Sequence, residues 1–211
     1  MFAIDPTVYT AYMGTCLLLS ITPGTDNIYV LTRTLSQGKS AGFMAALGVA
    51  LALVIQVVAL TMGLSQLFLS APKLYTAVKY AGVVYLLYLA YRAFFSNGNG
   101  AMLATSGDRL ANVRIVRQAM TLCLLNPKLA VFYIAFLPQF TDPAGASMAV
   151  QLFVLGLTFA VIGLTVFCVA ILCIAPIGAA LQSSPHFWKW QTRVSGSVLG
   201  AMAIWLAIAR D

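Results

Sequence analysis

Charged residues are scarce in this sequence, and acidic residues are the scarcest of them. Only 8% of the 211 residues are Asp, Glu, Lys or Arg, all five acids are aspartates, and there is a single histidine. Metal ions in proteins are held by clustered His, Cys, Asp or Glu ligands. The composition therefore argues against a metal site, and we expect no metal and no other cofactor.

Cysteine is also rare, and none of the four cysteines is part of a C-x-x-C motif. A disulfide framework or a zinc site would show characteristic cysteine spacings. All four cysteines fall in apolar stretches, so we expect them to be small buried hydrophobic side chains. They are Cys16, Cys123, Cys168 and Cys173.

Long polar segments are almost absent, because 61% of the residues are hydrophobic. A soluble core cannot bury so large a share, so the chain is predicted to be an integral membrane protein. The net charge of +7 arises mostly from basic residues near the ends of apolar stretches, where they meet lipid headgroups. We therefore expect the lipid bilayer as a partner, and no nucleic acid. The first five residues lack the basic segment of a cleavable signal, so the first apolar stretch is expected to be retained as a span.

Six apolar stretches are long enough to cross the ~30 Å hydrocarbon core as helices. The predicted fold class is an all-α integral membrane protein with six transmembrane helices. We expect one membrane domain over residues 1–211, in which a polar loop at 96–112 separates a first half, 1–95, from a second half, 113–211. The six stretches are Val8–Leu31, Ala41–Leu69, Ala77–Phe95, Gln118–Phe136, Met148–Ile174 and Trp190–Ala209.

The basic residues near the span ends predict the orientation. Three of them fall on one side of the membrane, namely Lys73, Lys79 and Arg210, and eight fall on the other. Because the richer side faces the cytoplasm, both termini are expected to be extracytoplasmic. The eight are Arg33, Lys39, Arg92, Arg109, Arg114, Arg117, Lys189 and Arg193.

The first apolar stretch is interrupted by the run Thr22-Pro23-Gly24-Thr25-Asp26-Asn27. A helix in hydrocarbon must satisfy its backbone groups internally, so a break at membrane depth is expected only where it is buried in protein or lines a watery cavity. A carboxylate at that depth costs about 2.5–3.5 kcal/mol on insertion scales and points to a functional site. Asp26 is therefore the leading candidate for a binding residue.

A matching break is predicted in the fourth stretch, at Pro127. When Pro23 is placed over Pro127, similar residues coincide in all three spans of each half. Three spans per half make the repeat an inverted 3+3 repeat, with helices 1 and 4 broken at these prolines. Lys128, expected to be the only basic residue deep within a span, should then approach Asp26 and interact with it. Lys128 could also bind loop carbonyls or a substrate carboxylate, and the pair could be purely structural.

Polar and small residues beside the two breaks complete the candidate substrate and proton site. Each polar residue either contacts the substrate or satisfies backbone groups that the break sets free. Gln56, alone in an apolar run, faces the cavity or forms a hydrogen bond to another helix. The candidates are Asp26, Lys128, Pro23, Gly24, Thr25, Asn27, Asn126, Pro127 and Gln56.

Small residues recur at a spacing of four, as in Gly42-x-x-x-Ala46, Gly48-x-x-x-Ala52 and Gly196-x-x-x-Gly200. Such faces allow helix backbones to approach closely. The spacing does not distinguish packing within one chain from packing in a homodimer, so both remain open.

These motifs resemble those of the LysE/RhtB family of amino-acid exporters, whose first span typically carries Pro-Gly-Pro-Asn or Pro-Gly-Pro-Asp and whose fourth carries Asn-Pro-Lys. The matching stretches are Pro23-Gly24-Thr25-Asp26, Leu125-Asn126-Pro127-Lys128 and Phe136-Leu137-Pro138-Gln139-Phe140, and the resemblance extends over nearly the whole chain. Two positions depart from the family pattern. Thr25 replaces the second proline, and Gln56 stands where relatives often have histidine.

The resemblance implies a transporter and not an enzyme, one that exports amino acids or similar small metabolites across a bacterial inner membrane in exchange for protons. Burial favours the neutral form of a carboxyl group and a nearby cation favours its charged form. Asp26 can therefore alternate between binding a proton and binding the substrate amine. Three other classes remain open: a membrane thiol–disulfide electron carrier, a metal-ion exporter and a nontransporting scaffold of the same fold.

Overall fold

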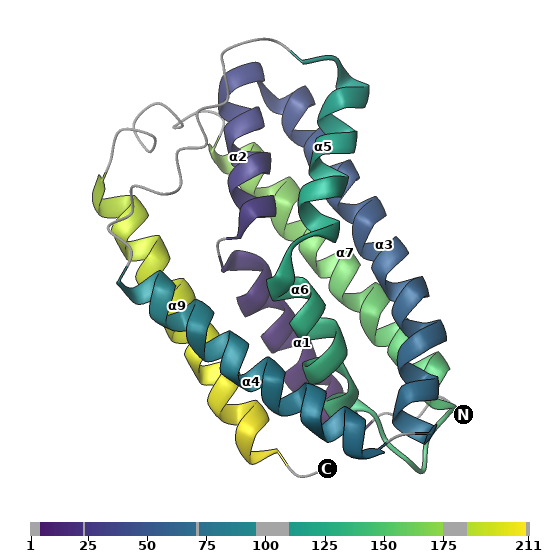
Figure 1. Cartoon of the computed structure of the whole chain (residues 1–211). Helices are drawn as coiled ribbons and strands as arrows, with labels where there is room; N and C mark the ends of the chain where they lie inside the picture. Colours follow the sequence, from purple (N-terminus) through teal and green to yellow (C-terminus); the bar gives the residue numbers. More distant parts are fainter. Residues whose placement is uncertain (1–4, 23, 71, 96–109, 175–184, 210–211) are drawn as a thin grey trace.

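The computed structural model describes residues 5–22, 24–70, 72–95, 110–174 and 185–209, and the side chains of these residues except 64–70, 72, 174, 185–188 and 191. Pro23 and residues 96–109, most of the predicted loop, lie outside the described residues. Every regular element within the described ranges is a helix and none is a strand. The predicted all-α class is therefore confirmed, and Figure 1 shows the helices gathered into one bundle.

The first apolar stretch folds as two short helices, α1 (Pro6–Ile21) and α2 (Thr25–Gln37). The Asp5 carboxylate accepts a hydrogen bond of 2.7 Å from the backbone N–H of Thr7 and so caps the start of α1. Gly38 follows α2 with a φ of 90°, in the left-handed region that favours glycine. With 16 and 13 residues, neither helix reaches the ~20 residues that a single crossing needs.

Three helices are long and apolar enough to cross a membrane without a break: α3 (Lys39–Ser70), α4 (Pro72–Phe94) and α7 (Met148–Ile174). A bent pair, Asn112–Leu124 with Pro127–Phe140, forms a fourth crossing if it is counted as one span. By length and composition, the described residues thus contain three or four crossings. The count of six remains a prediction.

The bent pair begins with α5 (Asn112–Leu124) and continues through α6 (Pro127–Val131), at an angle of 49°. Pro127 is the first residue of α6. The N–H of a first helical residue has no acceptor within the helix, so proline, which lacks it, loses no hydrogen bond there. The chain then continues as a π-helix, η2 (Phe132–Phe136), and a 3₁₀-helix, η3 (Leu137–Phe140). Irregular helix of this kind is frequent at functional sites.

Aromatic side chains hold the irregular segment in place. The ring of Phe132 packs 4.8 Å from Phe159 of α7 and 6.5 Å from Tyr12 of α1, measured between ring centroids. The ring of Phe140 stacks 5.2 Å from Trp205 of α9 (Pro185–Ile208). Large buried rings dominate core energetics, so this cluster ties η2 and η3 to three other helices.

Corresponding helices of the two halves pack against one another: α3 against α7, and α4 against α9. Small residues allow close approach at these and neighbouring contacts. A β-carbon at Gly48 would clash with the Val116 carbonyl of α5, and one at Gly196 would lie 2.6 Å from a ring carbon of Phe94 in α4. These two small-residue faces thus pack within the chain.

Two basic side chains besides Lys128 are buried among the described residues. Lys79 of α4 is 1% exposed and donates a hydrogen bond of 2.7 Å from Nζ to the Ala209 carbonyl at the end of α9. Arg33 of α2 is 5% exposed. From the sequence, both residues were expected at span ends that face lipid headgroups. A count of charges does not show which helices cover a side chain.

Candidate functional site

The two helix breaks meet through a hydrogen bond between residues 100 positions apart. Asn126 Nδ2 donates to Asp26 Oδ1 at 2.7 Å, and both side chains are buried. Asn126 also caps α6, because its Oδ1 accepts a hydrogen bond of 3.1 Å from the backbone N–H of Lys128. Asp26 lies in the first turn of α2, where the helix dipole favours negative charge. One amide side chain therefore joins the start of α6 to the start of α2.

Lys128 reaches the end of α1 from the opposite break. Its Nζ donates a hydrogen bond of 3.0 Å to the carbonyl of Thr22, directly after the last residue of α1. The negative end of a helix dipole lies at such carbonyls and favours a cation. In the part of the chain that the structure describes, neither Lys128 nor Asp26 forms an ion pair. The two charges are brought together by a shared cavity and not by direct contact.

That cavity has a volume of about 10 Å³, with a polar side and an apolar side. It has room for about one water molecule, whereas sites for small molecules usually measure about 300–1,000 Å³. A cavity of this size does not hold an amino acid, so such a ligand could bind here only if the helices moved apart. The cavity is lined by Leu19, Ser20, Asp26, Asn27, Val49, Leu53, Lys128, Leu129, Phe159, Gly163 and Phe167.

Ser20 is a lining residue that our reading of the sequence missed. Its Oγ is buried, and no described residue forms a hydrogen bond with it. It faces Gly163 of α7, where an added β-carbon would lie 3.7 Å away. An unsatisfied buried hydroxyl costs about 1–3 kcal/mol, so it is suited to a ligand or a water molecule in the cavity. The position of Ser20, about one turn before the helix break, could have indicated that it lines the cavity. Nothing in the local sequence indicated the apolar wall from α7.

Two predicted site residues form hydrogen bonds to backbone carbonyls near the helix breaks. Asn27 Nδ2 donates to the Ser20 carbonyl at 2.7 Å. Gln56 Nε2 donates to the Cys123 carbonyl at 3.2 Å, near the end of α5. Asn27 also lines the cavity, whereas Gln56 does not. Gln56 thus forms the interhelical hydrogen bond that was one of its two predicted roles.

Thr25 lies apart from the cavity, although we had grouped it with the site. Its side chain is exposed, and Thr25 is the first residue of α2. Proline is favoured at this position because a backbone N–H here would have no acceptor within the helix, so its absence costs nothing. Gly24 before it is extended, with φ of −143° and ψ of 179°, as a residue preceding proline should be. Threonine and proline are therefore interchangeable here in backbone terms.

We accordingly expect the Thr25→Pro variant to fold and to unfold at the same temperature or slightly higher, since a compatible proline stabilises by about 0.4–1 kcal/mol. The matched variant Ile28→Pro should unfold at a clearly lower temperature. It removes the N–H that donates to the Gly24 carbonyl at 3.0 Å, and an interior proline costs about 3 kcal/mol. Thermal unfolding of both variants in detergent tests this, and equal damage from both substitutions would contradict it.

A family model described as LysE type translocator matches residues 17–210. The chain belongs to this family. Two curated relatives of the translocator are leucine efflux proteins of Salmonella choleraesuis and Salmonella typhimurium, each 27% identical over 94% of this chain and 92% of the relative. An uncharacterized membrane protein of Vibrio cholerae is 27% identical over 98% of this chain and 100% of its own length. No solved structure matches.

In this LysE-type translocator, two of the three stretches that carried the family resemblance contact each other beside the cavity. Asp26 comes from the first motif, and Asn126 and Lys128 come from the second. Cys16 and Cys123 are buried free thiols. Within the described ranges, no group of three or more His, Cys, Asp or Glu side chains is placed to hold a metal ion.

Proposed function

We propose that this translocator exports neutral amino acids with aliphatic side chains, by exchange for protons across the bacterial inner membrane. One observation carries the proposal: the buried cavity between the two helix breaks has one carboxylate, one ammonium group and an apolar wall. The curated relatives named leucine efflux protein support the same substrate class.

The lining residues complement the three parts of such a substrate. Asp26 supplies a negative charge for the ammonium group, and Lys128 supplies a positive charge for the carboxylate. Apolar side chains such as Leu53 and Phe159 receive the aliphatic group. Asp26 is the only acid among the lining residues. A basic amino acid would therefore bury a second cation without a partner, which is strongly unfavourable.

Proton exchange follows from the position of Asp26. We propose that the substrate ammonium group and a proton compete for the Asp26 carboxylate, so that one leaves before the other binds. Each transport cycle would thus carry a proton inward in place of the exported substrate. Because the cavity is too small for an amino acid, the substrate reaches Asp26 only when the helices move apart on one side of the membrane.

The same proposal includes the six-span inverted repeat, with α1 and α2 together as the first span and α5, α6, η2 and η3 as the fourth. Three pairings support it: the breaks meet at Asp26 and Asn126, α3 packs on α7, and α4 packs on α9. Each element thus contacts its counterpart, as a two-fold relation in the membrane plane requires. We keep both termini extracytoplasmic, on the basis of the positive-inside rule.

Efflux from preloaded proteoliposomes tests the proposal. We expect labelled L-leucine to leave the vesicles faster when a pH gradient is imposed, and L-lysine to leave no faster than from vesicles without protein. Leucine efflux that is insensitive to the gradient would remove the proton exchange from the mechanism. An absence of flux for every neutral amino acid would overturn the proposed function itself.

A substitution at Gly24 tests the geometry of the site without changing the charge of Asp26 or Lys128. A β-carbon at this position would lie 2.7 Å from Asp26 Oδ1 and 3.0 Å from Lys128 Nζ, so both groups must shift. Because these are ends of flexible side chains, we expect Gly24→Ala to fold normally but to export leucine about 10- to 100-fold more slowly, as misplaced binding groups do. The control is Gly14→Ala in α1, where no atom lies within 4 Å. Equal export rates in the two variants would contradict the assigned geometry.

A further inference from the structure

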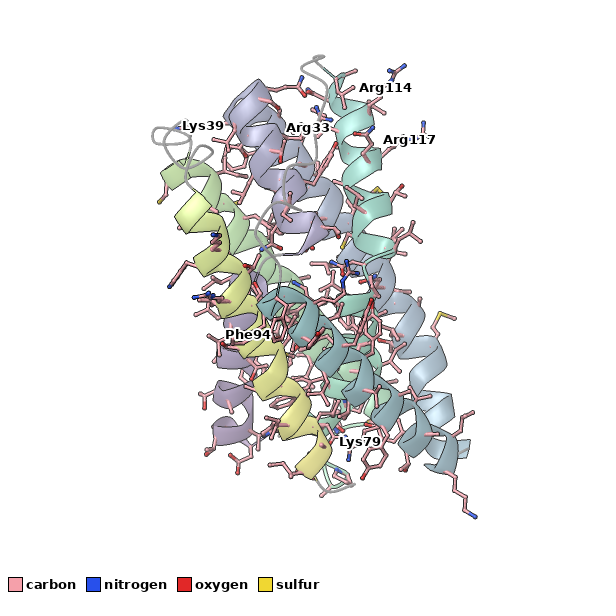
Figure 2. The ribbon with its side chains drawn as sticks, turned by 60° about the vertical axis from the view of Figure 1, so that its left-hand side comes forward. Arg33, Lys39, Lys79, Phe94, Arg114 and Arg117 are labelled. Atoms are coloured by element: carbon pink, nitrogen blue, oxygen red, sulfur yellow. The ribbon has the colours of Figure 1, made fainter. Side chains whose placement is uncertain are left out.

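Arg33 is a buried cation that has no part in the cavity at Asp26. It lies on α2, seven residues after Asp26, which is two helical turns or about 10 Å along the axis. Asp26, Val30 and Arg33 are all buried and share one face of this helix. Figure 2 places Arg33 with Lys39, Arg114 and Arg117 at one end of the bundle, opposite to Lys79.

The guanidinium group of Arg33 has only neutral neighbours. Its Nη1 donates to Gln37 Oε1 at 3.1 Å, and its central carbon lies 5.3 Å from the ring centroid of Tyr29. The Nε is buried, and no described residue forms a hydrogen bond with it. No carboxylate among the described residues pairs with Arg33. Because arginine is always protonated, this is a buried charge without a counterion in the described part of the chain.

An isolated buried charge is costly, and membrane proteins generally keep one only where it serves a function. The two side chains that contact Arg33 also form hydrogen bonds to a second segment of the chain. The Tyr29 hydroxyl donates to Gln118 Oε1 of α5 at 2.8 Å. Gln37 Nε2 donates to the Leu110 carbonyl, just before α5, at 3.4 Å. Two helices therefore hold the guanidinium in a polar, aromatic setting. A planar oxyanion that accepts two parallel hydrogen bonds is the ligand such a fork suits best.

We infer that Arg33 binds the α-carboxylate of the exported amino acid, as a second site that the substrate occupies before it reaches Asp26 and Lys128. This inference rests on the proposed function, since it takes its ligand from there. The exposed basic residues at the same end, Lys39, Arg114 and Arg117, are available to lipid phosphates. Arg33 is only 5% exposed, so the ligand would have to enter between the helices to reach it.

Transport kinetics with substrate supplied at the face nearest Arg33 test the inference. For Arg33→Gln we expect the KM for L-leucine to rise about 10- to 100-fold while kcat changes less than about twofold, because a charge-assisted contact is lost at an entry site and not at the transport site. Arg33→Lys, which keeps the charge but not the planar fork, should fall between. Arg117→Gln, an exposed residue at the same end, is the control and should resemble wild type. A fall in kcat with an unchanged KM would overturn the inference.

A binding measurement separates this inference from the proposed function. In detergent, 4-methylpentanoate, which has the carboxylate but no amine, should stabilise wild-type protein against heat, and Arg33→Gln should lose most of that stabilisation while Lys128→Met retains part of it. Loss in the Lys128 variant alone would overturn the Arg33 site even if export is confirmed. Stabilisation through Arg33 would remain measurable even if no amino acid is exported. In proteoliposomes, a difference between Arg33→Gln and wild type that occurs only with added phosphatidylglycerol would identify a lipid phosphate as the ligand and overturn the inference.

Discussion

Replacement of Asp26 by asparagine is expected to slow pH-driven leucine efflux by about 100-fold while the fold is kept. Asparagine retains the Oδ1 that accepts the 2.7 Å hydrogen bond from Asn126, so the link between the two breaks survives. What is lost is the negative charge for the ammonium group and the site for the proton. A hydrogen bond to a charged group contributes about 1.5–3 kcal/mol, and about 1.4 kcal/mol corresponds to a tenfold change.

The matched control is Asp5→Asn, because asparagine and aspartate cap helices equally well and Asp5 is exposed at the start of α1. Export by the control should equal that of wild type. Efflux is measured from proteoliposomes at equal protein content, with and without the pH gradient. Gradient-driven export by Asp26→Asn at the wild-type rate would remove Asp26 from the mechanism.

Replacement of Lys128 by methionine is expected to impair both export and stability. The Thr22 carbonyl, which accepts from Lys128 Nζ at 3.0 Å, would be left buried without this partner, at a cost of about 1–3 kcal/mol. The cavity would also keep the Asp26 carboxylate without a cation. Export should therefore fall about 100-fold or more, and the temperature of half-unfolding in detergent should fall with it.

The double variant Asp26→Asn, Lys128→Met distinguishes a functional Lys128 from a structural one. Neutralising both groups removes the unbalanced buried charge, so its stability should exceed that of Lys128→Met alone, which is the sign of coupled residues. Its export should remain as low as that of either single variant. If export recovered together with stability, the two charges would serve only to hold the halves together.

The places where the first and fourth spans are interrupted could be predicted because their cause is local. Proline lacks an N–H and is favoured only in the first turn of a helix. Accordingly, α6 begins at Pro127, and α1 ends at Ile21, two residues before Pro23. The hydrogen-bond partner of a buried side chain depends on residues that are distant in the sequence, so a local pattern does not predict it. The sequence predicted that Asp26 and Lys128 interact, with loop carbonyls as an alternative partner for Lys128. The structure places Asn126 against Asp26 and the Thr22 carbonyl against Lys128.

The amino-acid sequence predicted that this chain belongs in a membrane, that polar residues would interrupt its helices, and that Asp26 and Lys128 stand out among its few charges. Composition and proline chemistry suffice for these conclusions, because each concerns how a residue interacts with lipid or with its own backbone. The packing of the helices showed that Ser20 lines the cavity, that Thr25 lies outside it and that Arg33 is buried. Burial depends on which distant helix covers a side chain, and that is settled by packing across the whole bundle.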